Sequence, residues 1–139
     1  MYQFTWKLRV SYADTDKMGY AYYGNYARYF EIARVEALRH IGISYKELED
    51  EGVMLPVLDF SIRYYKPAFY DDEISIKVIM EELPDTRITF TYQTFDAKGV
   101  QLNLATTTLV FVSIETKRPI RIPDKVFAAF KTHFIDAST

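Results

Sequence analysis

Residues 20–42 read YAYYGNYARYFEIARVEALRHIG, and their pattern determines the central helix of the predicted fold. Apolar residues recur in it every three or four positions, at Tyr26, Phe30, Ala33, Ala37 and Ile41. Because this is the spacing of one helix face, and charged residues occupy the other faces, we predict a helix from about Tyr26 to His40. Asn25 is the expected N-cap of that helix, and Gly42 is its expected stop.

The regions on both sides of this helix have the period of strands. Before the helix, the even positions from Phe4 to Tyr12 are apolar, which predicts a strand with one buried face. The later runs with strand character are residues 53–66, 73–82, 86–96 and 100–114. Pro56 interrupts the first of them, and the Ala-Lys-Gly sequence at 97–99 is a hairpin signal between the last two.

Two shorter helices complete the predicted elements. Ser44 and Glu47 have the spacing of a capping box, which predicts a short helix that ends at about Glu51. Pro123 is placed to begin a last short helix. The resulting order predicts an α+β fold in which one long helix covers the apolar face of a curved antiparallel sheet.

The composition limits the classes of protein to consider. A chain of 139 residues, 49% apolar and 26% charged, fits a single globular domain over residues 1–139. The net charge is −2 with scattered basic residues, which gives no footprint for nucleic acid, and no window approaches the ~18 apolar residues of a membrane span. The absence of cysteine fits a cytoplasmic protein, and the 17% aromatic content suggests surface covered by partner subunits.

If the protein is an enzyme, its catalytic groups are expected to be acidic residues, because the sequence lacks the other common catalytic motifs. The chain has two histidines, whose positions near a helix end and the terminus favour structural roles, and it lacks serine-elbow, phosphate-loop and dinucleotide motifs. The densest cluster is DTDKMG at 14–19. Met18 and Asn25 stand where a calcium loop needs an oxygen ligand and a bidentate Glu, so we predict no metal and no cofactor. An ordinary turn is the alternative for this cluster.

The position of this acidic cluster, just before the long helix, favours a catalytic role over an ordinary turn. A carboxylate beside a helix N-terminus lies near backbone N–H groups that can polarise a carbonyl oxygen. Hydrolysis of a thioester requires few further catalytic groups, because its thiol leaving group, with a pKa of about 8.5, departs without a strong general acid. One carboxylate therefore suffices, either by attacking the carbonyl or by activating a water molecule.

The run YADTDKMGYAYYGNYARYFEIAR at 12–34 resembles the signature of the hotdog-fold acyl-CoA thioesterases of the 4-hydroxybenzoyl-CoA thioesterase type. RYYKPAFYDDEI at 63–74 and KRPIRIPDKV at 117–126 are similar to later segments of the same family, so the resemblance covers nearly the whole chain. It implies a hotdog fold, with a curved antiparallel sheet wrapped around one long central helix and a short C-terminal helix. It also implies hydrolysis of an acyl-CoA or acyl-carrier thioester to the free acid and the thiol.

The resemblance also assigns roles within the loop. Asp16 matches the catalytic aspartate, and Tyr23 matches the position whose backbone N–H faces the thioester carbonyl. Gly19 and Asn25 are expected to shape the loop and cap the helix. Gly19, Tyr20 and Asn25 are also candidate contacts to the substrate. Tyr20 departs from the family pattern, which often has His or an aliphatic residue after this Gly, so the shape of the acyl pocket is not carried over.

Other residues are assigned with an alternative beside each. Tyr26 is a candidate substrate contact, although helical spacing favours core packing for Tyr22, Tyr26, Tyr29 and Phe30. Asp14 is the weaker of the two candidates for the catalytic acid, and it is expected instead to organise the loop as a hydrogen-bond acceptor. The cations that could meet CoA phosphates are Lys117, Arg118 and Arg121. A solvated turn explains these cations equally well.

The resemblance implies a homodimer or homotetramer with sites at the subunit interface. Two other functions are considered on the same fold. One is a protein that binds an acyl thioester without hydrolysing it, since fold does not fix function. The other is a dehydratase, which ranks last because no His lies near the motif.

Overall fold

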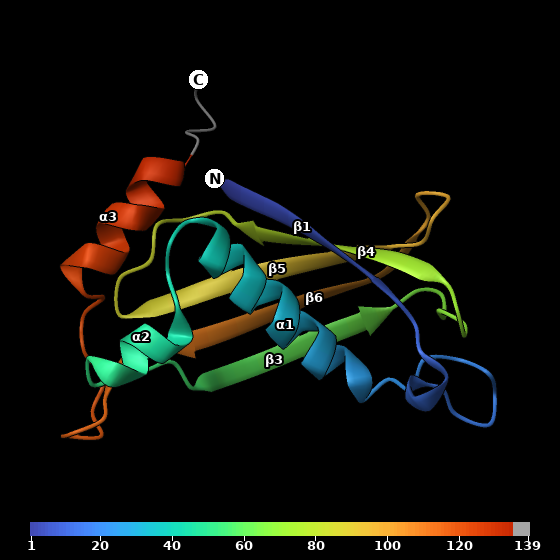
Figure 1. The fold of residues 1–139 in the computed structure, drawn as a ribbon, viewed down its shortest axis with the longest axis horizontal. Coiled ribbons are helices and arrows are strands. Elements are labelled where there is room, and N and C mark those ends of the chain that lie inside the picture. The colour runs from blue at the N-terminus through green and yellow to red at the C-terminus, as the bar shows by residue number, and fades with distance from the viewer. Residues whose placement is uncertain (135–139) are drawn as a thin grey trace.

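A computed structural model describes residues 1–134, and its main feature is an antiparallel sheet with one long helix against it (Figure 1). The elements in chain order are β1 (Tyr2–Arg9), the 3₁₀ turn η1 (Tyr12–Asp14), α1 (Asn25–His40), α2 (Tyr45–Asp50), β2 (Val53–Met54), β3 (Val57–Tyr64), β4 (Glu73–Met80), β5 (Arg87–Phe95), β6 (Gln101–Val110), β7 (Val112–Ser113) and α3 (Asp124–His133). None of the described helices is long and apolar enough to cross a membrane. The predicted α+β class is confirmed.

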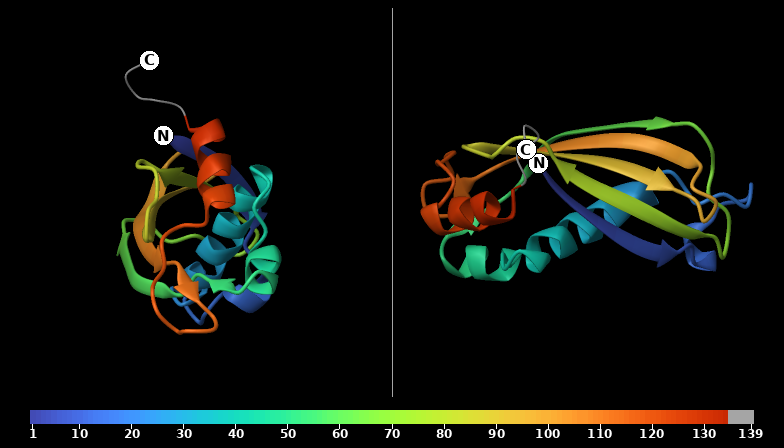
Figure 2. Two further views of the ribbon diagram at one scale, coloured as in Figure 1. Left: turned by 90° about the vertical axis from the view of Figure 1, so that its left-hand side faces the viewer. Right: turned by 90° about the horizontal axis from the view of Figure 1, so that it is seen from above.

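Five strands form the main sheet in the order β1-β4-β5-β6-β3, and every neighbouring pair is antiparallel. The strands curve around α1, as the left view of Figure 2 shows. The hairpin predicted at 97–99 joins β5 to β6, where Gly99 has a φ of +85°. Since β1 and β3 each have only one neighbour, they are the two edges of the sheet.

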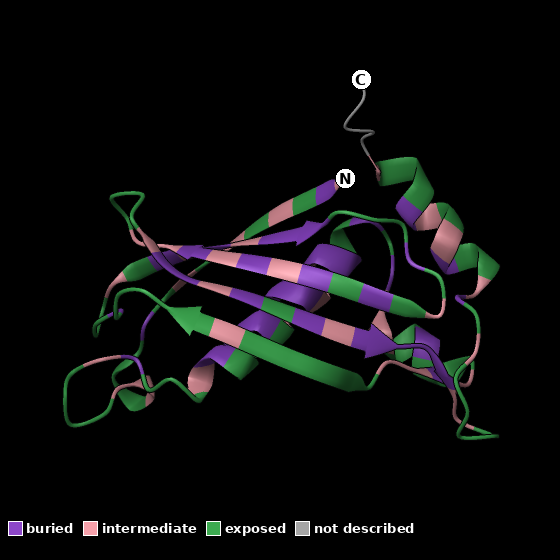
Figure 3. Ribbon diagram, turned by 180° about the vertical axis from the view of Figure 1, so that it is seen from behind, coloured by how far each residue is buried: buried purple, intermediate pink, exposed green. Residues whose placement is uncertain are grey.

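The core lies between α1 and the concave face of the sheet. The helix buries Tyr26, Tyr29, Phe30, Ala33, Ala37 and Leu38. Burial alternates along β5, where Ile88, Phe90, Tyr92 and Thr94 are buried. Figure 3 shows this alternation as bands across the strands, and it shows β3 exposed along most of its length. The helical and strand periods read from the sequence therefore identify the two faces that meet.

The start of α1 differs from the prediction. The helix begins at Asn25 and its N-cap is Gly24, so Asn25 does not cap it. Gly24 already has helical dihedrals (φ −64°, ψ −20°), and the Asn25 N–H donates to the Tyr22 carbonyl within the preceding turn. The Asn25 side chain instead donates to the Asp14 carbonyl at 2.9 Å. The end of the helix is as predicted, because Gly42 follows it with a φ of +88°.

The cap of α2 agrees with the prediction, whereas the end of β1 and the position of Tyr22 do not. Ser44 caps α2 and accepts a hydrogen bond from the Glu47 N–H, which confirms the cap predicted there. The first strand ends at Arg9, before Tyr12, because the chain turns into η1; the Tyr12 side chain is 77% exposed. Tyr22 is also exposed, contrary to the prediction of core packing, because it lies in the turn before α1 where helical spacing does not apply.

Candidate active site

Asp14 anchors the loop between β1 and α1. Its carboxylate accepts hydrogen bonds from Arg28 Nη2 at 2.7 Å and from the Tyr29 hydroxyl at 2.8 Å, both on α1. Its carbonyl accepts from the Tyr22 N–H and from the Asn25 side chain. Burial alone would raise the pKa of Asp14, but the hydrogen bonds from Tyr29 and Arg28 and the positive charge of Arg28 outweigh it and lower the pKa. The predicted role of Asp14 as a loop-organising acceptor is confirmed.

Asp16 opens a tight turn that presents its carboxylate to the surface. The Met18 N–H donates to Asp16 Oδ1 at 2.9 Å, and the Gly19 N–H donates to the Asp16 carbonyl at 3.0 Å. Gly19 has a φ of +79°, a conformation that side chains other than glycine rarely adopt. Asp16 Oδ2 accepts no hydrogen bond from any residue in the described range, so this oxygen is available for chemistry.

Tyr23 brings a backbone donor to the same place. Within residues 1–134, the N–H groups of Tyr23 and Gly24 donate to no other group, whereas the neighbouring Tyr22 N–H is bonded to Asp14. Unpaired N–H groups at the start of a helix carry its positive end and attract negative charge. An oxygen that gains negative charge beside Tyr23 would meet this donor.

Asp16 and Tyr23 line one pocket of about 290 Å³ at the entrance to α1. The other lining residues are Tyr20, Ala21, Tyr26, Tyr64, Tyr65, Lys66 and Pro67. Of the residues predicted from the sequence, Asp16, Tyr20, Tyr23 and Tyr26 are thus brought together. Gly19 and Asn25 lie outside the lining and support the loop behind it.

The predicted CoA-binding cations lie elsewhere in the chain. Lys117, Arg118 and Arg121 follow β7, in a segment at the opposite end of the sheet from the Asp16 loop (Figure 1). Arg121 pairs with Asp85 at 3.2 Å, with both side chains well exposed. These cations therefore do not reach the Asp16 pocket of the same chain.

Sequence reasoning missed the part of the pocket that comes from the end of β3. The Ala21 N–H donates to the Ala68 carbonyl at 2.7 Å, and Tyr20 pairs with Phe69. These contacts place residues 64–67, which include Lys66, beside the Asp16 loop. The only sequence signal was the Tyr-Tyr-Lys-Pro run itself, because a pairing between segments so far apart leaves no local pattern.

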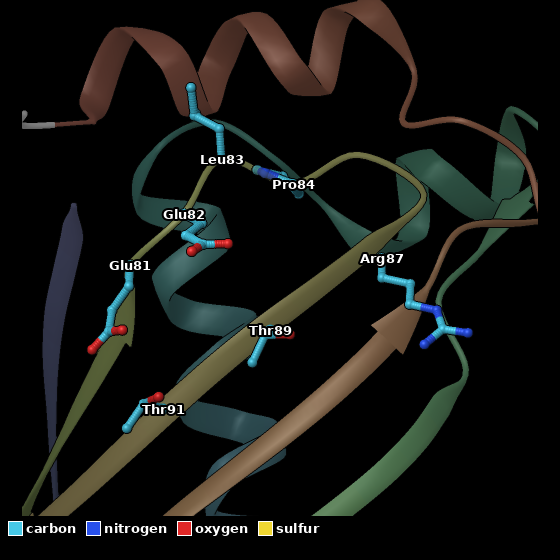
Figure 4. A pocket seen from close by; sticks show the side chains of 7 residues that line it. All are labelled: Glu81, Glu82, Leu83, Pro84, Arg87, Thr89 and Thr91. Carbon is cyan, nitrogen blue, oxygen red and sulfur yellow. The ribbon is translucent and has the colours of Figure 1, made fainter.

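A second hollow, of about 210 Å³, lies on the outer face of the sheet near α3 (Figure 4). Thr89 and Thr91 of β5 line it, with Glu81 on one side and Arg87 on the other. None of the residues predicted to carry chemistry lines this hollow. The chemistry therefore points to the Asp16 pocket.

Comparison with known proteins identifies the family of the chain. A family model described as the Thioesterase-like superfamily matches residues 10–130. The chain belongs to this superfamily. Its curated relatives include the acyl-CoA thioester hydrolase YbgC of Escherichia coli O6:H1, which is 34% identical over 128 residues, covering 92% of this chain and 96% of that protein.

Solved thioesterase structures share the fold of this superfamily member. DHNA-CoA thioesterase from Staphylococcus aureus superimposes with a TM-score of 0.89 at 32% identity, covering 95% of this chain and 91% of the other. A 4-hydroxybenzoyl CoA thioesterase gives a TM-score of 0.83 at 18% identity, covering 93% of this chain and 99% of that one, a level that shows the fold alone. The predicted hotdog fold and the predicted family are both confirmed.

Replacing Gly19 with Ala tests the turn that holds Asp16. No heavy atom lies within 4 Å of an added Cβ, so the cost is backbone strain of about 1 kcal/mol in the free energy of unfolding. We expect that loss together with a several-fold fall in kcat, because the Asp16 turn shifts. Gly52→Ala is the matched control, since Gly52 has a φ of +87° and equal space but follows α2. The control should lose similar stability and keep its kcat, and an equal fall in kcat for both variants would contradict the assignment.

Proposed function

We propose that this thioesterase hydrolyses acyl-CoA thioesters in the Asp16 pocket. The observation that carries the proposal is the presence in one pocket of the Asp16 carboxylate and the Tyr23 N–H: within residues 1–134, one oxygen of the carboxylate accepts no hydrogen bond and the N–H donates to no other group. A base or nucleophile and an oxyanion donor are the two groups that acyl transfer requires.

The reaction follows from these two groups. In one route, Asp16 removes a proton from a water molecule, whose oxygen bonds to the thioester carbon as the proton moves to the carboxylate. In the other, the Asp16 carboxylate bonds to that carbon itself, and water later hydrolyses the acid anhydride. In both, the carbonyl oxygen becomes negative opposite the Tyr23 N–H, the C–S bond breaks, and the sulfur leaves as a thiolate that takes up a proton.

Binding of CoA calls for cations near the pocket mouth. Lys66 lines the pocket and can meet a phosphate or a carbonyl of the CoA arm. Lys117, Arg118 and Arg121 remain predicted contacts to CoA phosphates. They would have to act from a second subunit, given their place in the chain.

We also propose that the chain works as a homodimer, because the pocket is open in one chain. Asp16 is exposed, and so are many large apolar side chains around it and along the β3 edge. The exposed apolar residues in these two places are Tyr12, Met18, Tyr22, Tyr23, Val57, Leu58, Phe60, Tyr64, Tyr65, Phe69 and Tyr70. A free antiparallel edge rich in apolar residues can pair with its own copy about a two-fold axis. Such pairing would exclude water from the site.

Leu58→Lys is expected to weaken this dimer. Leu58 lies on the β3 edge with 53% of its surface exposed, and a lysine there would place two like charges at a self-paired edge. Sedimentation equilibrium should show a dimer for the wild type and mostly monomer for the variant, with lower thioesterase activity. Leu83→Lys is the control, because Leu83 is 38% exposed but lies between β4 and β5. A monomeric wild type at micromolar concentration would refute the dimer.

Hydrolysis itself is tested with the purified wild-type protein. A free-thiol reagent should report steady release of CoA from a panel of short, long and aromatic acyl-CoAs. Tight binding without thiol release over long incubation would instead assign a carrier or binding role. CoA thioesters made in metabolism are found inside the cell, so the proposal places the protein in the cytoplasm.

A further inference from the structure

Three buried polar side chains, one of which lines the pocket, have polar atoms without a well-formed hydrogen bond in the part of the chain that the structure describes. They are Tyr26 on α1, Thr94 on β5 and Asn103 on β6, with exposed fractions of 3%, 0% and 0%. Within residues 1–134, the Thr94 hydroxyl meets no partner, and the Tyr26 hydroxyl and the Asn103 amide make no hydrogen bond of good geometry, although Asn103 lies close enough to the Tyr26 hydroxyl to lower its pKa. The other polar network under α1 is bonded, since Arg34 donates to the hydroxyls of Tyr45 and Tyr92.

The three side chains form one cluster against the wall of the Asp16 pocket. Thr94 and Asn103 are direct cross-strand partners on the concave face of the sheet, and Tyr64 is the partner of Asn103 on its other side. The ring centroids of Tyr64 and Tyr26 lie 5.9 Å apart, and both residues line the pocket. Asn103 therefore lies next to Tyr64 on the sheet, with Thr94 beside it on the following strand.

Tyr64, which lines the pocket next to Asn103, makes only weak polar contacts with other described residues. The Tyr64 hydroxyl donates to the Tyr23 carbonyl at 3.3 Å, an exposed and long bond, and Tyr64 itself is 45% exposed at the end of an edge strand. Rotation of this side chain towards solvent would break this hydrogen bond and the ring contacts of Tyr64 with Tyr23 and Tyr26, and it would give an acyl group in the pocket access to the cluster.

The free-energy cost of the cluster argues for a ligand. An unpaired buried polar group destabilises the folded state, so an apolar core at these positions would be more stable. Burial also raises the pKa of Tyr26 to about 12, which keeps its hydroxyl neutral. Together the four atoms offer hydrogen-bond donors and acceptors without any charge.

We propose that Tyr26, Thr94 and Asn103 form the inner end of the acyl pocket and bind an uncharged hydroxyl or keto oxygen at the far end of the acyl group. A plain hydrocarbon end would leave these atoms unpaired, and a carboxylate would need a cation. The site therefore favours acyl groups with a distal oxygen. This inference rests on the proposed thioesterase site for its substrate, but it concerns different residues.

Matched substrates that differ by one hydroxyl group test the subsite. The pairs are benzoyl-CoA with 4-hydroxybenzoyl-CoA, and hexanoyl-CoA with 6-hydroxyhexanoyl-CoA. The wild type should favour the hydroxylated member of at least one pair by about tenfold or more in kcat/KM, because a site built for a hydroxyl rejects an analogue that lacks it. Thr94→Val and Asn103→Leu keep the side-chain volume and should reduce that ratio to less than about threefold.

The control variant makes the same change on the other face of the sheet. Thr106→Val lies on β6 and is exposed, so the substrate ratio should stay at the wild-type value. Thr94→Val should fold with an unchanged or higher Tm, since it removes an unpartnered buried hydroxyl. A wild-type ratio near one in both pairs, or an equal loss for both members of a pair in Thr94→Val, would overturn the subsite.

Binding separates a failure of the subsite from a failure of hydrolysis. Isothermal titration calorimetry with thioether analogues of the same pairs measures the preference without turnover. Preferential binding of the hydroxylated analogue without thiol release from any CoA ester would support the subsite and refute the proposed reaction. Thiol release from both members of a pair at equal rates, with equal binding of their analogues, would do the reverse.

Discussion

Replacing Asp16 with Asn is expected to lower kcat for acyl-CoA hydrolysis by roughly a hundredfold or more. The amide can neither accept a proton from water nor attack a thioester carbon. The fold of the loop should survive, because the Met18 N–H donates to Oδ1 of residue 16, and an Asn side chain offers the same oxygen. The measurement is steady-state thiol release across the acyl-CoA panel, together with Tm by calorimetry.

The control for this variant is Asp50→Asn. Asp50 is an exposed carboxylate at the end of α2, away from the pocket, so the variant makes the same change in net charge. Its kcat should equal that of the wild type. Turnover that survives in Asp16→Asn, with a normal Tm, would remove Asp16 from the reaction and leave the fold assignment untouched.

The elements of the fold were predictable because each leaves a local period in the sequence. The helical spacing from Tyr26 to Ile41 and the alternation along β1 and β5 reflect which side chains face the core. The start of α1 was predicted one residue late, because Gly24 adopts helical dihedrals that composition does not reveal. Tyr12 broke the alternation where the chain turned.

In the candidate site, too, the residues close together in sequence were predictable, and those brought in by long-range contacts were not. Asp16 and Tyr23 lie close in sequence within the motif that carries the family resemblance, and both line the same pocket. Their catalytic roles stay a prediction. Tyr64 and Lys66 join them only through the pairing of Tyr20 with Phe69, which no local pattern encodes. A prediction of the pocket's far wall required the strand order.

The polar cluster behind the wall shows another limit of sequence reasoning. Strand alternation places Thr94 and Asn103 on the inner face, but both read as ordinary residues of two long strands. Whether their polar atoms find partners depends on the register of β5 against β6 and on the position of Tyr26 above them. Only the three-dimensional arrangement of residues 1–134 reveals such atoms beside the Asp16 pocket.

Replacing Asp14 with Asn is expected to lower the free energy of unfolding by about 1–3 kcal/mol above pH 5 and to lower kcat about tenfold. The variant loses the ion pair with Arg28, and its NH₂ group would face the donors on Arg28 or Tyr29. The Asp14 carbonyl also holds the Tyr22 N–H, so a looser loop moves the neighbouring Tyr23 donor. Denaturant unfolding and thiol release measure the two effects.

The pH dependence gives the sharper test of this anchor. Because the pKa of Asp14 is lowered in the folded state, its contribution to stability is present above the unfolded pKa of about 3.9 and is lost as pH falls through the folded pKa. The Tm difference between wild type and Asp14→Asn should therefore be largest above pH 5 and shrink below about pH 4. Asp50→Asn should show no such convergence. A constant difference down to pH 3 would mean that the anchor acts through shape, and not through the charge that Arg28 and Tyr29 hold in place.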